Sequence, residues 1–166
     1  MKKLILIFTL FSMFSISLAE EVNVRKVADF KLKLLNGKRT SFYTILEEGP
    51  VLLDFWATWC GPCKKAMVHQ EYFHQKYKDQ GFQILTINQD SPKSLSKVKG
   101  YIRSKKFSFL VGLDPNQQIA KMFNAVLLPT MILIDKEGEI VWRHQGFIPG
   151  DEVEIEAKIK SLLAIE

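Results

Sequence analysis

The sequence predicts an α/β protein in which helices flank a central mixed β-sheet. Two nearly continuous apolar runs, over 51–56 and 82–87, are typical of strands buried on both faces. Segments with apolar residues at helical spacing follow both runs, and this alternation favours a layered sheet covered by helices. The chain has 166 residues, of which 47% are hydrophobic and 25% charged. These values fit one folded domain and exclude an intrinsically disordered chain.

The first 19 residues predict a cleaved signal peptide (1–19). Two lysines precede an apolar run over 4–18, and the segment closes with Ser17-Leu18-Ala19, whose small residues Ser17 and Ala19 stand at the positions that a signal peptidase reads. This run is short for a membrane-spanning helix, and a retained N-terminal anchor is the alternative. The sequence has no cysteine near the cleavage point, so a lipid-modified start is not expected. We therefore expect residues 20–166 to form a soluble domain that is periplasmic, or otherwise exported, without stable membrane insertion.

The chain ahead of the cysteines predicts a hairpin and then a buried strand. Over 29–42, apolar residues alternate with polar ones, and Asn36-Gly37 is a strong signal for a tight turn. The strand predicted over 51–56 begins directly after a Gly-Pro pair, which indicates a turn or loop at that point. An N-terminal β-hairpin should therefore lie ahead of the main sheet.

The remaining elements alternate between helical and strand patterns. Helices are predicted where apolar residues recur every three to four positions, over 60–78, 94–105, 116–123 and 151–163. Further strands are predicted over short apolar runs, at 82–87, 109–111, 131–134 and 140–143. The last helix begins with acidic residues, which suit a helix N-terminus. No internal repeat or Pro/Ser-rich linker interrupts this pattern, so we expect one domain.

The chemistry is predicted at Cys60 and Cys63, the two cysteines of the chain. The run Trp59-Cys60-Gly61-Pro62-Cys63 lies where a buried strand gives way to a helix, and C-x-x-C in that context indicates a redox motif. The free N–H groups and partial positive charge of a helix start favour a thiolate. We expect Cys60 to face solvent and act as the nucleophile, and Cys63, one turn inward, to resolve the mixed disulfide.

Two other roles for the cysteine pair fit the sequence less well. A disulfide between residues three positions apart closes too small a ring to restrain the unfolded chain. A zinc site would need two more ligands, and His69, His74 and His144 do not supply a recognisable second pair. We therefore predict no metal and no cofactor, because the dithiol itself carries two electrons.

The run from Asp54 to Lys64, DFWATWCGPCK, resembles the active-site strand and helix start of the thioredoxin superfamily. The export signal, the N-terminal hairpin and an extra helix between 88 and 107 make the chain similar to the TlpA/ResA-like periplasmic branch of that superfamily. A second signature, Leu127-Leu128-Pro129-Thr130, follows later in the chain. The resemblance covers nearly all of 25–163 and implies a thioredoxin fold with an inserted helix and thiol–disulfide oxidoreductase activity.

The resemblance also implies a substrate-binding surface. Pro129 is expected to form a cis peptide bond beside the cysteines, and the Leu128 main chain to pair with an extended substrate segment. Taken alone, Pro129 is more typical of an ordinary strand start, and the cysteine motif favours the cis bond. Trp59 is expected to form an apolar rim for docking, together with Gly61 and Pro62.

Asp54 is expected to assist proton transfer at Cys63, and its surroundings depart from the family pattern. Many TlpA-like members carry an acid and a proline where this chain has Ala66 and Val68, so a mechanism that relies on that acid is absent. The lysine that accompanies this aspartate in many thioredoxins is replaced near Thr86. We therefore expect Asp54 to be strongly desolvated, with a raised pKa.

The charge distribution argues against nucleic acid as a partner. The net charge is +5, or +3 without the first 19 residues, and acids are mixed throughout the chain. Six basic residues between 93 and 106 form either a solvated helix face or a docking patch for an acidic partner: Lys93, Lys97, Lys99, Arg103, Lys105 and Lys106.

The sequence therefore predicts a monomeric, exported enzyme that reduces disulfides in envelope proteins and receives electrons from an unidentified thiol protein. A disulfide oxidase or isomerase in the same compartment is the alternative within this class. A peroxiredoxin-like peroxidase would need Thr or Ser three positions before its reactive cysteine, where Ala57 stands. A non-catalytic docking module would keep its function after both cysteines were replaced by serine.

Overall fold

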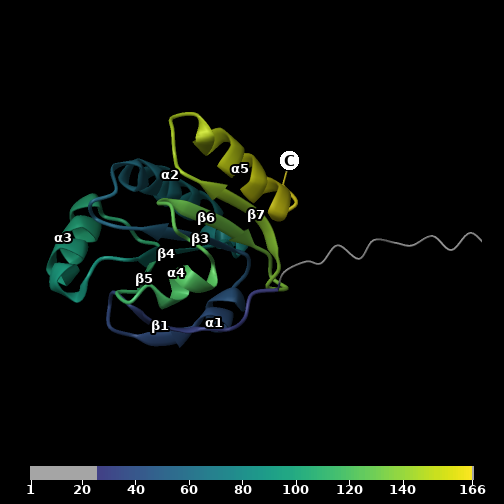
Figure 1. Ribbon diagram of the computed structural model, residues 1–166. Helices are drawn as coiled ribbons and strands as arrows, with labels where there is room; N and C mark the ends of the chain where they lie inside the picture. Colours follow the sequence, from purple (N-terminus) through teal and green to yellow (C-terminus); the bar gives the residue numbers. More distant parts are fainter. Residues whose placement is uncertain (1–25, 166) are drawn as a thin grey trace, which may run out of the picture.

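Seven strands form one mixed sheet in the order β2-β1-β5-β4-β3-β6-β7 (Figure 1). The computed structural model describes residues 26–165, so the predicted signal peptide lies outside the described residues. Within 26–165, no helix combines the length and apolar character that crossing a membrane requires.

The elements follow each other in nearly the predicted places. The strands are β1 (Lys31–Leu34), β2 (Arg39–Ser41), β3 (Val51–Trp56), β4 (Gln83–Asn88), β5 (Leu110–Leu113), β6 (Thr130–Ile134) and β7 (Ile140–Gln145). The α-helices are α1 (Phe42–Leu46), α2 (Gly61–Tyr77), α3 (Leu95–Lys105), α4 (Gln118–Met122) and α5 (Asp151–Leu162), and two 3₁₀ turns are η1 (Lys78–Gln80) and η2 (Pro92–Ser94).

Strand β3 lies inside the sheet and leads directly into the cysteine motif. It pairs in parallel with β4 and antiparallel with β6, and all six of its residues are buried. In this register Asp54 lies between Thr86 on β4 and Met131 on β6. The continuous apolar run is therefore explained by helices that cover both faces of the strand.

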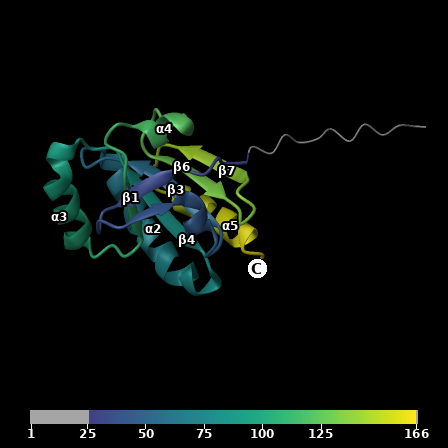
Figure 2. The same cartoon turned by 90° about the horizontal axis from the view of Figure 1, so that it is seen from below.

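The two faces of the sheet form two apolar cores. Leu52 and Trp56 belong to the core under α2, α3 and α5, whereas Leu53 and Phe55 belong to the core that includes α1, α4 and the N-terminal hairpin. Figure 1 shows α2 and α5 on one side of the sheet and α1 and α4 on the other. Figure 2 shows the inserted helix α3 at one edge of the molecule.

The predicted fold class, a thioredoxin fold with an N-terminal hairpin and an inserted helix, is confirmed. The hairpin turn also forms as expected, and Gly37 has a φ of 94°, which favours glycine. One element was not predicted: helix α1 begins at Phe42, where the predicted hairpin ends. Ser41 caps this five-residue helix by accepting a hydrogen bond from the Thr44 N–H.

Candidate active site

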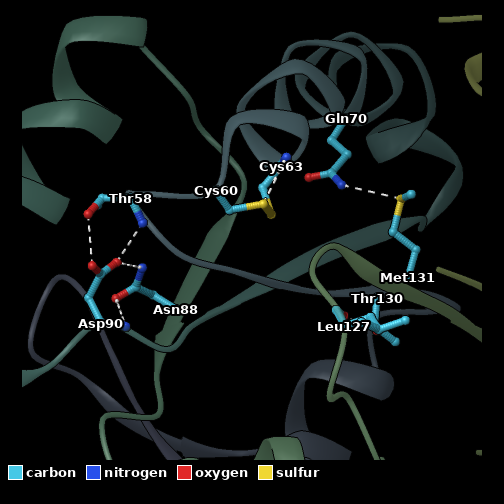
Figure 3. The surroundings of a disulfide bond; sticks show 9 residues. All are labelled: Thr58, Cys60, Cys63, Gln70, Asn88, Asp90, Leu127, Thr130 and Met131. Atoms are coloured by element: carbon cyan, nitrogen blue, oxygen red, sulfur yellow. Dashed lines mark hydrogen bonds between the residues drawn. A yellow bond between two sulfur atoms is a disulfide. The ribbon is translucent and has the colours of Figure 1, made fainter. Parts of the chain in front are cut away.

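Cys60 and Cys63 lie at the start of α2, directly beyond the end of β3, and form a disulfide with a Cα–Cα distance of 5.3 Å (Figure 3). Cys60 is the N-cap residue, and its Sγ accepts a hydrogen bond from the Cys63 N–H at 3.1 Å. Pro62 lies in the first turn, where its missing N–H leaves no gap in the helix. After reduction, the same N–H and the helix start favour a thiolate at Cys60.

The prediction that Cys60 faces solvent is wrong for this disulfide-bonded form. Residue Cys60 is only 5% exposed, and Cys63 is completely buried. Both belong to the apolar core that includes Trp56 and Met67, because the disulfide holds the Cys60 sulfur against its buried partner. The small difference in exposure still favours Cys60 as the sulfur that a substrate reaches first.

An exposed apolar surface begins at Trp59, directly before Cys60. Trp59 is 71% exposed, and Val126 and Leu127 are also exposed. These residues line a groove of about 590 Å³ together with Leu128 and Gln89. Exposed apolar patches of this kind mark surfaces that bind other molecules.

The segment before β6 has the geometry that the resemblance implies. The Leu128–Pro129 peptide bond is cis, which confirms the prediction for Pro129. Thr130 lies opposite Phe55, so this segment passes the end of β3 that leads to the cysteines. Within residues 26–165, the main-chain N–H and C=O of Leu128 make no hydrogen bond.

A polar cluster that the sequence analysis missed holds the loop ahead of Cys60. The buried Asp90 carboxylate accepts hydrogen bonds from the N–H and the hydroxyl of Thr58, both at 2.7 Å, and from the Asn88 amide at 2.8 Å (Figure 3). These bonds fix the chain two residues before Cys60. An aspartate just after a buried strand is the only signal for them in the sequence, and it does not indicate the partner.

Asp54 lies fully buried in β3, as its position in an apolar run suggests. Burial raises its pKa to about 8, against a smaller lowering by the Gln70 amide. Thr86, and not a lysine, occupies the neighbouring position in β4, so no cation there compensates the charge. The expectation of a desolvated carboxyl with a raised pKa is confirmed.

The remaining candidates lie outside this constellation. Within residues 26–165, no three His, Cys, Asp or Glu side chains are grouped to hold a metal ion. The six basic residues of 93–106 are all exposed on and around α3. Tyr101 of α3 packs against Trp56 and lies under the Lys64 ammonium, which places this helix near the start of α2. Whether the basic residues bind an acidic partner stays a prediction.

Comparison with known proteins supports the interpretation of the cysteine pair as a redox site. Residues 23–159 match the Redoxin family model. The chain is 32% identical over 140 residues to the thiol-disulfide oxidoreductase ResA of Bacillus cereus, which covers 84% of this chain and 79% of the relative. It is 34% identical over 113 residues to ResA of Bacillus subtilis, which covers 68% of this chain and 62% of the relative.

Solved structures agree with these relatives. A putative thiol:disulfide interchange protein DsbE from Chlorobium tepidum superposes with a TM-score of 0.77 at 31% identity, covering 84% of this chain and 96% of that chain. A putative protein disulfide isomerase from Bacteroides thetaiotaomicron gives a TM-score of 0.74 at 30% identity. The match covers 86% of this chain and 92% of that chain. With its cysteine pair at the start of α2, the chain belongs to the Redoxin family and is a thiol–disulfide oxidoreductase of thioredoxin-like fold.

Proposed function

We propose that the protein is exported and reduces disulfide bonds of envelope proteins through Cys60 and Cys63. The observation that carries this proposal is a disulfide at a helix start, bordered by the exposed apolar surface of Trp59, Val126 and Leu127. A protein substrate covers such a surface more readily than a small solute does, because it contributes apolar area of its own.

In the proposed reaction, the Cys60 thiolate attacks one sulfur of the substrate disulfide. A mixed disulfide forms, and the other substrate sulfur leaves as a thiolate and takes up a proton. Cys63 then gives its proton to Asp54 and attacks the Cys60 sulfur. The second substrate sulfur leaves as a thiolate and takes up a proton, which Asp54 can return, so the substrate gains two electrons and this protein ends as the Cys60–Cys63 disulfide. A carboxyl with a pKa of about 8 can accept and return a proton near neutral pH.

The substrate is proposed to lie along the segment ahead of β6. The unpaired main-chain groups of Leu128 can hydrogen-bond to an extended segment, in the manner of an added strand. Pro129 shapes this edge, while Trp59, Gly61 and Pro62 border the attacking sulfur and are exposed. The protein is proposed to act as a monomer that exchanges electrons with substrate disulfides and with a separate donor thiol protein.

The expected reduction potential is about −250 mV, which makes the protein a reductant towards most substrates. Gly61 and Pro62 place no cation between the cysteines that would stabilise the reduced form. When it is ionised, the buried Asp54 disfavours further negative charge at the site and so favours disulfide formation in this protein. Equilibration with glutathione buffers of known potential measures the value. A result of about −120 mV would support the alternative, a disulfide oxidase.

Export is proposed from the sequence of the first 19 residues, and the mature protein is expected to begin at Glu20. N-terminal sequencing of the protein recovered from the cell envelope checks this prediction. Recovery of the intact Met1 terminus in the membrane fraction would contradict cleavage and support the retained anchor. An Ala19→Leu variant, which removes the small residue at the cleavage point, is the matched control and should stay uncleaved.

A further inference from the structure

Gln70 is a polar residue on the buried face of α2. It lies seven residues after Cys63, and this spacing places both side chains on the same face of the helix, two turns apart. Gln70 is 1% exposed and faces the core under α2. A glutamine amide carries two donors and one carbonyl acceptor, which normally all find partners when they are buried.

The hydrogen bonds of Gln70 are incomplete. Its Nε2 donates to the Met131 sulfur at 3.6 Å, and Figure 3 shows the side chain extending from α2 towards Met131. A thioether is a weak acceptor. Within residues 26–165, the Gln70 Oε1 has no hydrogen-bond partner. The amide is therefore held in the core without the contacts that would compensate its burial.

Asp54 is a second buried polar residue that lacks hydrogen-bond partners within the described residues. It lies opposite Met131 in the pairing of β3 with β6, and within the described residues neither of its carboxyl oxygens has a hydrogen-bond partner. The Gln70 amide and the Phe55 main-chain N–H both lower the pKa of Asp54, although neither has the geometry of a hydrogen bond to its carboxyl. Within the described residues, two buried groups with unsatisfied oxygens thus meet at Met131, one through a side-chain contact and the other through strand pairing.

We propose that Gln70 is a positioning residue for Asp54, and that its amide stabilises both protonation states of this carboxyl in turn. When Asp54 is ionised, the Gln70 NH₂ group donates to the carboxylate. When Asp54 has taken the proton of Cys63, the carboxyl O–H donates to the Gln70 Oε1, and the NH₂ group returns to the Met131 sulfur. A primary amide can make both contacts by rotating about one bond. The inference rests on the proposed role of Asp54 in proton transfer.

The chain offers a variant that removes only this chemistry. Gln70→Met keeps the length of the side chain and is apolar, and replacing a buried, incompletely bonded polar group by an apolar one does not endanger folding. Gln75→Met is the matched control, because Gln75 lies on the exposed face of the same helix and bonds to Glu71 and Ser108. Asp54→Asn removes the carboxyl and reports whether the proposed proton transfer exists.

The experiment measures the two thiol exchange steps separately. Reduced protein reacts with the aromatic disulfide DTNB, which releases one thionitrobenzoate on attack by Cys60 and a second on resolution by Cys63. In Gln70→Met the resolution rate at pH 7 should fall about tenfold, and the midpoint of its pH profile should rise by about one unit, because the amide bonds more strongly to the ionised carboxylate than to the neutral acid. The attack step should stay within about twofold, and Gln75→Met should match the wild type in both steps.

Two results would overturn the inference in different ways. If Gln70→Met leaves the pH midpoint unchanged while Asp54→Asn shifts or abolishes it, Gln70 only fills space and the role of Asp54 survives. If Asp54→Asn leaves the wild-type profile unchanged, the proton transfer itself fails, and the role of Gln70 fails with it. The infrared carbonyl band of protonated Asp54, identified by its loss in Asp54→Asn, gives a second reading. It should shift to higher frequency in Gln70→Met.

Discussion

Replacing Cys60 by serine is expected to slow the reduction of a protein disulfide by at least about 10³-fold, because a hydroxyl cannot replace the thiolate as nucleophile. Replacing Cys63 by serine should have a different effect. Cys60 remains at the helix start and can attack, so the protein should accumulate as a mixed disulfide with its substrate. The two variants therefore separate attack from resolution.

Insulin reduction by the pre-reduced proteins measures the first effect, and mass spectrometry of the trapped adduct measures the second. The Cys60→Ser/Cys63→Ser protein serves as the control for background exchange. Cys60→Ser should form a mixed disulfide through Cys63 far more slowly than Cys63→Ser forms one through Cys60. Equal rates would contradict the assigned roles. Full function of the double variant in cells would instead support a non-catalytic docking module.

Replacing Asp54 by asparagine is expected to stabilise the disulfide-bonded protein by about 4 kcal/mol at pH 7. The carboxyl has a reference pKa of 3.8 and a pKa of about 8 in the folded protein, where burial opposes its ionisation. Between these values the folded state binds more protons than the unfolded state. The free energy of unfolding therefore falls as the pH rises from about 4 to about 8, and it levels off above that range.

Chemical denaturation of the wild type and of Asp54→Asn at several pH values measures this dependence. The difference between them should be small near pH 4 and grow with pH. Asp90→Asn is the matched control, because Asp90 is also buried but accepts three hydrogen bonds. That change should destabilise the protein at pH 7 by about 1–3 kcal/mol, opposite in sign. A stability difference for Asp54→Asn that does not vary with pH would show that Asp54 is ionised in both states.

The local pattern of the sequence determines the main elements of this protein. The apolar run 51–56 became β3 with the expected bounds, because a strand covered on both faces needs an apolar residue at every position except the one that carries chemistry. Local sequence likewise determines the turn at Asn36-Gly37, through backbone preference, and the start of α2 at the cysteine motif, through helix capping. The cis bond at Pro129 followed from the resemblance and not from its own neighbours.

Only the tertiary structure decided how distant segments meet at the site. Asp90 bonds to Thr58 across 32 residues, and Gln70 meets Met131 across 61 residues beside Asp54. Cys60 is covered because both cysteines pack into a core built from several elements. Periodicity reports the local conformation of a segment and which face it buries, but a polar contact depends on the partner that another element brings to that face. This is the physical reason why the dithiol and the buried Asp54 were predictable, whereas the contacts of Asp90 with Thr58 and of Gln70 with Met131 were not.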